Sequence, residues 1–313
     1  MNESLTLSKN VVDTDYDDIP REVAAVTKKS LLDAIGVILA AGKLGEGCKQ
    51  FVTLAIEQGG KKESTILGFD AKVPACMAAF ANGSMSHALD FEDTHDMALV
   101  HPNAAAIPAA LAISESLGNV SGKELITALT LGSDLVARLG LAVKENAVEY
   151  GWYMPPILEA FGATTAAGKL LKLDVEQIRN GFSLTLCQAT CSAELIYSSD
   201  SMIRAIRDAF SAKAGLLSAL LAQKGITGFQ QPFEGKAGLF NNYSRGKWDP
   251  RSLTNDLGEI FEGANVSFKP WPSCRGTHAY IDATLRILEE HPLKPAEIKE
   301  INLTVNYFCI NLT

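Results

Sequence analysis

A short stretch near residue 90 carries most of the side chains that could move a proton or hold an anion. It reads HALDFEDTH over residues 87–95 and is followed by Val-His-Pro at 100–102. If this stretch is helical, spacings of three and four place one imidazole, two carboxylates and a hydroxyl on one face: His87, Asp90, Asp93 and Thr94. Burying such a face is unfavourable unless its groups interact. The pattern is typical of an acid–base site, and also of a solvated acidic helix end with a capping histidine.

His101 is the candidate general base. Pro102 suits the first turn of a helix over NAAAIPAALAISE, which places His101 at the N-terminal end of that helix. The positive end of the helix dipole lowers the pKa of an imidazole there. A histidine that is neutral near pH 7 can accept a proton from a substrate.

Helical patterns that would position these residues dominate the chain up to about residue 260. An amphipathic run follows Pro20 and continues through Leu39, and a second run, 48–58, stops at two glycines. Capping-box patterns stand at 121–124 and 174–177, and another apolar stripe covers 204–224. Small residues recur in segments such as AAFANG and FGATTAAGKLL. They let helices approach closely and predict a compact bundle.

The pattern changes near Gly263. FKPWPSC is punctuated by proline, THAYIDATLRILEEH predicts a helix, and INLTVNYFC at 301–309 alternates like a strand. We therefore expect a mainly α protein, with an all-helical domain over 1–262 and the beginning of a smaller α/β domain over 263–313. A strand at the end of the chain without partners suggests that the chain is truncated.

Composition excludes several classes of function. The chain has 313 residues and a net charge of −8, which disfavours a broad nucleic-acid surface. The N-terminus is polar and acidic, unlike a signal peptide, and the apolar stretch Leu31–Ala41 is too short for a membrane span. Six cysteines without a CxxC pair predict no zinc site. We expect a cytoplasmic protein without metal, membrane or nucleic-acid partners.

Longer motifs resemble a known family. The segment SMSHALDFEDTH…HPNAAAIPAALA is similar to the MSHALDFDDTH…HP-type motif of the MmgE/PrpD family, and FGATTAAGKLLKLD, PFEGKAGLF and FKPWPSCRGTHAYIDA follow in the family's order. The family includes 2-methylcitrate dehydratase, cis-aconitate decarboxylase and an iminodisuccinate epimerase, which act on small di- or tricarboxylates without a metal or organic cofactor. The resemblance implies a large helical domain, an α/β lid, a site between them and a homodimer formed through the helical domains.

The resemblance also implies roles for individual residues. Asp90, Thr94 and His101 would be catalytic, and His101 would transfer the proton. The expected substrate-binding residues are Asp93, Lys269, Arg204 and Arg207. The alternatives are that Lys269 is a surface lysine beside a proline turn, and that the arginines are ordinary helix-surface cations balanced by Asp200 and Asp208.

Two departures from the family pattern bear on the substrate. Met154 stands where relatives often carry a cleft histidine, and Cys274 stands where decarboxylase-like members tend to have histidine. Both argue against decarboxylation of cis-aconitate. We therefore expect a cofactor-free hydro-lyase that resembles 2-methylcitrate dehydratase. The alternatives are an epimerase or isomerase of a substituted dicarboxylate, and a non-catalytic truncated helical dimer.

Overall fold

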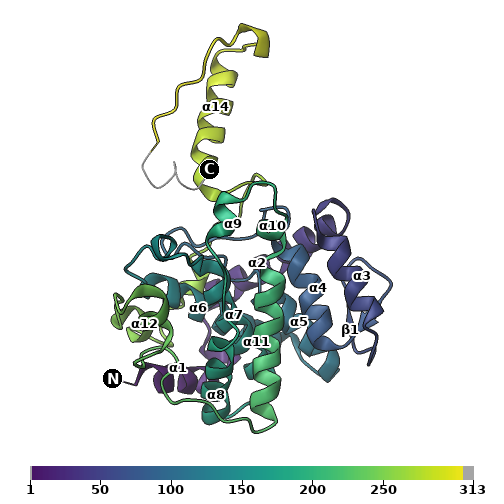
Figure 1. The fold of residues 1–313 in the computed structure, drawn as a ribbon, viewed down its shortest axis with the longest axis vertical. Helices are drawn as coiled ribbons and strands as arrows, with labels where there is room; N and C mark the ends of the chain where they lie inside the picture. Colours follow the sequence, from purple (N-terminus) through teal and green to yellow (C-terminus); the bar gives the residue numbers. More distant parts are fainter. Residues whose placement is uncertain (1, 306–313) are drawn as a thin grey trace.

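Helices account for nearly all regular structure in residues 2–305, the part of the chain that the computed structural model describes (Figure 1). The α-helices are α1 (Glu3–Asp13), α2 (Arg21–Leu44), α3 (Cys48–Glu57), α4 (Ala75–His87), α5 (Ala106–Leu117), α6 (Gly122–Ala142), α7 (Met154–Leu170), α8 (Val175–Leu186), α9 (Glu194–Tyr197), α10 (Ile203–Ile206), α11 (Asp208–Gln223), α12 (Leu239–Ser244), α13 (Arg251–Thr254) and α14 (His278–Glu290). Short 3-10 turns are η1 (Tyr16–Asp18), η2 (Ala147–Tyr150), η3 (Glu262–Ala264), η4 (Arg275–Thr277) and η5 (Pro295–Glu297). The strands β1 (Ser64–Thr65) and β2 (Lys72–Val73) pair antiparallel. The predicted mainly α fold is confirmed.

Both predicted capping boxes are present. The Ser121 hydroxyl accepts a hydrogen bond from the backbone N–H of Glu124, and the Glu124 carboxylate accepts one from the backbone N–H of Ser121. Asp174 and Gln177 make the same reciprocal pair at the start of α8. Each box satisfies two backbone donors that a helix N-terminus leaves without partners.

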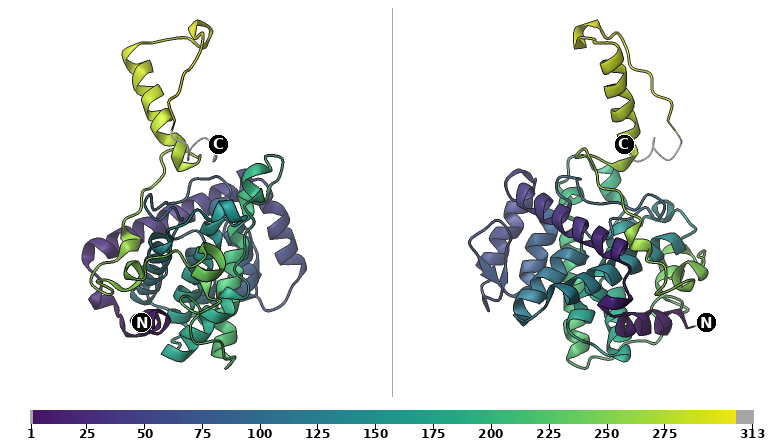
Figure 2. Two further views of the ribbon diagram at one scale, coloured as in Figure 1. Left: turned by 60° about the vertical axis from the view of Figure 1, so that its left-hand side comes forward. Right: turned by 180° about the vertical axis from the view of Figure 1, so that it is seen from behind.

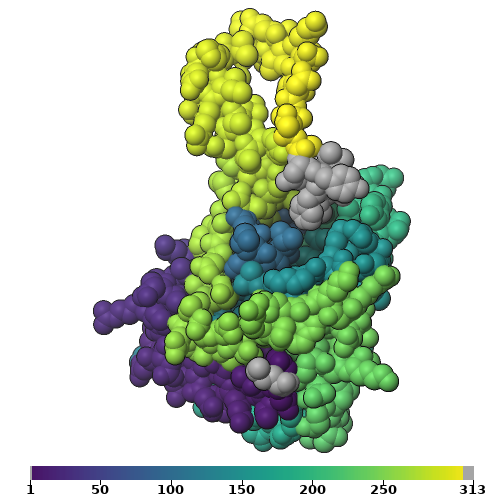
Figure 3. Space-filling model, turned by 90° about the vertical axis from the view of Figure 1, so that its left-hand side faces the viewer, coloured from purple at the N-terminus to yellow at the C-terminus, as the bar shows by residue number. Residues whose placement is uncertain are grey.

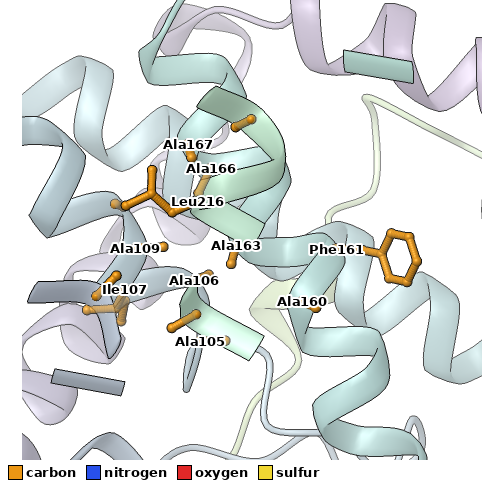
Figure 4. Close-up of a cluster of buried hydrophobic side chains, with 14 of the residues drawn as sticks. Ala105, Ala106, Ile107, Ala109, Ala160, Phe161, Ala163, Ala166, Ala167 and Leu216 are labelled. Carbon is orange, nitrogen blue, oxygen red and sulfur yellow. The ribbon is translucent and has the colours of Figure 1, made fainter. Parts of the chain in front are cut away.

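The core lies where α5, α6, α7 and α11 meet, and small side chains make it dense (Figure 4). Ala106 and Ala109 of α5 face Ala163 and Ala166 of α7 across this contact, with Leu216 of α11 above them. Glycines bring α6 and α7 closer still. A Cβ atom on Gly132 would lie 2.8 Å from the carbonyl oxygen of Gly162, so neither backbone has room for a side chain there.

Helix α6 is long and apolar enough, by length and composition alone, to cross a membrane. However, 83% of its apolar window is buried inside the protein, against α7, α2 and the 3-10 turn η3. This burial is typical of a core helix.

Two helix boundaries near residue 90 differ from the prediction. The helix predicted to carry residues 87–95 on one face ends at His87, and Asp90 has a left-handed backbone with φ of 50°. The helix predicted to begin at Pro102 begins at Ala106. Both predictions were wrong because residues 88–105 form a loop held by its own backbone pairs, including the bridge between His95 and Val100.

The C-terminal segment leaves the helical body after residue 274. Helix α14 confirms the helix predicted after FKPWPSC, but it stands away from the other helices in all views (Figures 2 and 3). The predicted strand at 301–309 does not form over residues 301–305, because no second strand lies beside them among the described residues. Its remaining positions lie outside the described residues. The domain boundary at 262/263 falls within η3 and stays a prediction.

Candidate active site

A loop between α4 and α5 brings the candidate residues together. Its residue Thr94 forms a backbone bridge with Ser267, in which each N–H donates to the other's carbonyl at 3.0 and 2.8 Å. This bridge places the segment around Lys269 against the loop. Residues almost 180 positions apart in sequence therefore meet at one site, as Lys269 and Asp90 do.

Glu92 is the centre of the site, and the sequence analysis gave it no role. Its Oε1 atom lies 2.7 Å from His87 Nδ1, 3.0 Å from His101 Nδ1 and 3.0 Å from Lys269 Nζ. The side chain is 3% exposed. Burial raises the pKa of Glu92, but its interactions with His87, His101 and Lys269 outweigh burial and hold this pKa well below its usual value. Glu92 is therefore an ionised, buried acceptor.

His101 is oriented as a base. Its Nδ1 atom lies 3.1 Å from the backbone oxygen of Asp93 and 3.0 Å from Glu92 Oε1. Both neighbours accept hydrogen bonds, so Nδ1 carries the proton and Nε2 keeps its lone pair. Burial is the main cause that lowers the pKa of His101 to about 4, helped by Lys269 and opposed by Glu92. His101 is thus neutral at pH 7, as predicted, but burial causes this, because α5 begins too far away for its dipole to act.

Lys269 is buried and donates hydrogen bonds to two carboxylates. Its ammonium group donates to Asp90 Oδ1 at 2.6 Å, to the Asp90 carbonyl oxygen at 3.1 Å and to Glu92 Oε1 at 3.0 Å. An ammonium group has three donor protons, and each has an acceptor here. The side chain is 0% exposed, so the surface-lysine alternative is wrong. In this arrangement Lys269 holds two protein carboxylates in place.

Arg204 has guanidinium N–H donors that have no hydrogen-bond partner among the described residues. Its only ion pair among the described residues joins Nη2 to Asp90 Oδ2 over 3.4 Å, and its side chain is 33% exposed. Asp90 is 23% exposed and bridges Arg204 to Lys269. Burial raises the pKa of Asp90, but the charges of His87 and Lys269 prevail and lower it to about 2. Arg204 can therefore offer a planar, two-point contact to an incoming carboxylate.

Arg207 lies behind the site. Its guanidinium is 2% exposed, contacts His87 Nε2 through Nη1, and stacks 5.2 Å from the centre of the Tyr153 ring. Arginine only donates, so His87 accepts at Nε2 and donates from Nδ1 to Glu92. Arg207 also borders a surface pocket of about 670 Å³ between α9 and α11. Through these contacts Arg207 orients the His87 ring.

Asp93 and Thr94 face the protein interior. The Asp93 carboxylate accepts from the Asn103 amide at 2.6 Å and is buried, and burial raises its pKa. Asp93 meets His101 through its backbone oxygen alone. Thr94 is 4% exposed, and its hydroxyl lies 3.5 Å from the Val100 carbonyl oxygen. The structure brings both residues to the site, with their side chains turned into the body.

Two further acids were missed. Glu159 on α7 accepts from the backbone N–H of His101 at 3.3 Å, and Asp208 lies 3.7 Å from His87 Nδ1. Both side chains are completely buried. Burial, followed by the charge of Asp208, raises the pKa of Glu159 well above its usual value. A glutamate inside the apolar run PPILEAFGATTAAG was the available signal, because a lone acid is seldom buried without partners.

Three of these side chains are also close enough to share a cation: ligand atoms of His87, Glu92 and His101 lie within 4.8 Å of one another. However, Lys269 and Arg207 already contact this group, and both imidazole Nδ1 atoms carry protons toward Glu92. A metal ion would have to displace those protons against two fixed positive charges. The arrangement fits a proton-holding cluster better than a metal centre.

The fold and this cluster define a helical protein with a buried cluster of acidic and basic side chains. The chain belongs to the MmgE/PrpD family: residues 5–251 match the model of the MmgE/PrpD N-terminal domain. It is 26% identical over 307 residues to a cis-aconitate decarboxylase-like protein of Aspergillus oryzae, which covers 93% of this chain and 62% of that protein.

Two mammalian proteins have a similar percentage of residues identical to this chain. The chain is 28% identical over 280 residues to mouse cis-aconitate decarboxylase, covering 86% of this chain and 55% of the relative. It is 27% identical over 294 residues to the human enzyme, covering 89% and 59%. The chain thus spans somewhat more than half the length of the curated relatives that it matches.

Proposed function

We propose that this protein is a lyase that removes a proton from the carbon next to a carboxylate of a small di- or tricarboxylate, and that it is a hydro-lyase of the 2-methylcitrate dehydratase type. One observation carries the proposal: His101 is held neutral, with its proton on Nδ1 and with no hydrogen bond to Nε2 among the described residues. A base in this state is ready to abstract a proton at neutral pH.

The steps balance without another co-reactant. His101 Nε2 takes the proton from carbon, and the electron pair moves toward the carboxylate, whose added charge Arg204 stabilises. The carbon–oxygen bond to the hydroxyl then breaks, and the imidazolium returns its proton to the leaving hydroxide, which departs as water. Asp90 stays ionised, since its pKa is about 2, so His101 serves as both base and acid.

Decarboxylation is the second candidate, because the relatives named above are cis-aconitate decarboxylases. That reaction releases carbon dioxide and adds a proton to carbon, so it needs a group that is protonated at the start. Neutral His101 holds no such proton on Nε2, and Met154, which opens α7 and packs on the core, has none to give. A neutral His101 is ready for the first step of elimination, which takes up a proton, and for this reason we favour elimination.

We propose an epimerase and a non-catalytic helical dimer as further alternatives. An epimerase needs acid–base groups on both faces of one carbon, and a non-catalytic helical dimer needs none. The proposal of a cytoplasmic location rests on the N-terminal sequence and the cysteine pattern, and that of a homodimer formed through the helical domain rests on the resemblance. The activity of the longer relatives extends to this chain only as a proposal, because the chain covers part of their length.

The test is an incubation in D2O with a panel that includes 2-methylcitrate, citrate, substituted succinates and cis-aconitate, followed by NMR of the carbon-bound protons. Loss of water from a hydroxy acid, or its reverse with deuterium added to carbon, is the expected result. Release of carbon dioxide from cis-aconitate would overturn the hydro-lyase proposal in favour of a decarboxylase. Exchange at one carbon without elimination would identify an epimerase.

A further inference from the structure

A single oxygen atom, Glu92 Oε1, lies within 3.0 Å of basic nitrogen atoms from three segments of the chain. They belong to His87 at the end of α4, His101 in the loop before α5, and Lys269 in the segment after η3. We propose that Glu92 is the positioning residue of the proposed reaction: it fixes the tautomer of His101 and stabilises the positive charge that His101 acquires when it takes the proton. This inference rests on the proposed function of His101.

The charges around His101 make this role specific. Burial disfavours a positive charge on the imidazole, and so do the nearby cations Lys269 and Arg207. Glu159 on the other side is held toward its neutral form by burial and by Asp208. Glu92 is the negative group within hydrogen-bond distance of the ring, at 3.0 Å. Without it, a proton taken by His101 would create a buried cation among cations.

The surroundings keep Glu92 from taking the proton itself. His87 donates to it at 2.7 Å, and Arg207 fixes His87 in the tautomer that can do so. Lys269 donates to it at 3.0 Å. These contacts leave Oε1 ionised and facing His101, which is the arrangement by which a carboxylate orients a catalytic histidine.

Replacing Glu92 by glutamine tests the effect of its negative charge separately from the effect of its shape. In Glu92→Gln the amide oxygen can face the same three donors, so the hydrogen bonds remain and the charge is lost. We expect kcat to fall on the order of 100-fold or more, with KM changed less than about threefold, because the charge acts when His101 is protonated. The acid limb of the pH–rate profile should also move to lower pH. Glu92→Asp keeps the charge and should recover part of kcat.

Asp33→Asn is the matched control. Asp33 is a half-buried carboxyl in the same region with no hydrogen bond or ion pair to these residues in the described part of the chain, and burial and the nearby Asp93 and Glu92 raise its pKa to about 6. Its replacement removes one carboxyl group without touching His101. We expect kcat within about twofold of wild type and an unmoved acid limb. Equal losses of kcat in Glu92→Gln and Asp33→Asn would overturn the role of Glu92.

A substrate-free measurement separates this inference from the proposed function. The Nδ1 proton of His101 should resonate at low field in wild type, in Asp33→Asn and in Glu92→Asp, and should move upfield in Glu92→Gln. An Nε2-protonated His101 in wild type, or an unmoved resonance in Glu92→Gln, would contradict the inference. If the resonance shifts as expected but no acid exchanges deuterium, the positioning role stands and the proposed reaction fails.

Discussion

The protein buries two clusters of opposite charges, and they differ in how completely their polar atoms are used. On α6, Arg138 donates to Asp134 at 2.8 Å and to the carbonyl oxygens of Asn255 and Ile260 at 2.9 and 2.6 Å. The other Asp134 oxygen accepts from the backbone N–H of Glu262 at 2.6 Å. This cluster ties the chain after α13 to the core.

The cluster at Glu92 is left incomplete. Buried oxygens of Glu92, Glu159 and Asp208, and the Nε atom of Arg207, have no hydrogen-bond partner among the described residues. Buried polar atoms are normally satisfied, because an unmade hydrogen bond in the interior destabilises the fold. A closed cluster stabilises the fold, while an open one can take up or pass on charge. The comparison predicts that substitutions in one cluster change stability and those in the other change activity.

His101→Gln should have the largest effect, and on activity. General-base catalysis is worth on the order of 100- to 10,000-fold, so deuterium exchange by this variant should fall by that factor. The melting temperature should stay within about 3 °C of wild type, because the glutamine amide can donate the same hydrogen bond to the Asp93 carbonyl oxygen. Thermal unfolding monitored by circular dichroism checks this. Full turnover in His101→Gln would contradict its role as the base.

Arg138→Leu should have the opposite effect, a large loss of stability. It leaves the Asp134 carboxylate buried without its cation and removes the donors to the two carbonyl oxygens. Breaking a buried pair in this way costs about 3–5 kcal/mol, which urea unfolding would measure. A loss below about 1 kcal/mol would mean that the α6 cluster does not hold the fold together, and would remove one side of the comparison.

Glu159→Gln should have the smallest effect at neutral pH. Burial and the charge of Asp208 raise the pKa of Glu159 in the folded protein and favour its neutral form, so glutamine, which needs no proton, should destabilise the fold by less than about 1 kcal/mol. A raised carboxyl pKa contributes stability below the unfolded value of 4.5, and that stability is lost as pH rises through the folded pKa. Wild type should therefore lose stability toward high pH more steeply than Glu159→Gln. Urea titrations at about pH 6 and pH 9 would show this, and parallel curves would contradict it.

Local sequence signals predicted the helices well. Capping boxes at Ser121 and Asp174 act through neighbours a few positions away, so they can be read from one segment. The predicted α14 formed for the same reason. The loop between α4 and α5 was mistaken for a helix because its backbone conformation depends on a partner far along the chain, Ser267.

The site was predicted in part. Motif residues His101, Asp90, Arg204 and Lys269 do meet, but their roles depend on side-chain directions that spacing does not give. The Lys269 side chain contacts Asp90 and Glu92, and the Arg207 side chain points into the protein and contacts His87. Glu159 and Asp208 come from separate helices, and only the packing of α7 against α11 makes them neighbours of the loop.

The pH dependence of wild-type deuterium exchange tests the central claim most directly. If burial holds His101 as a neutral base with a pKa of about 4, the rate should be nearly constant from about pH 8 to pH 5.5 and fall only toward pH 4. Exchange measured against His101→Gln as the background gives this profile. A rate that already halves near pH 6.5, the ordinary value for histidine, would contradict the account.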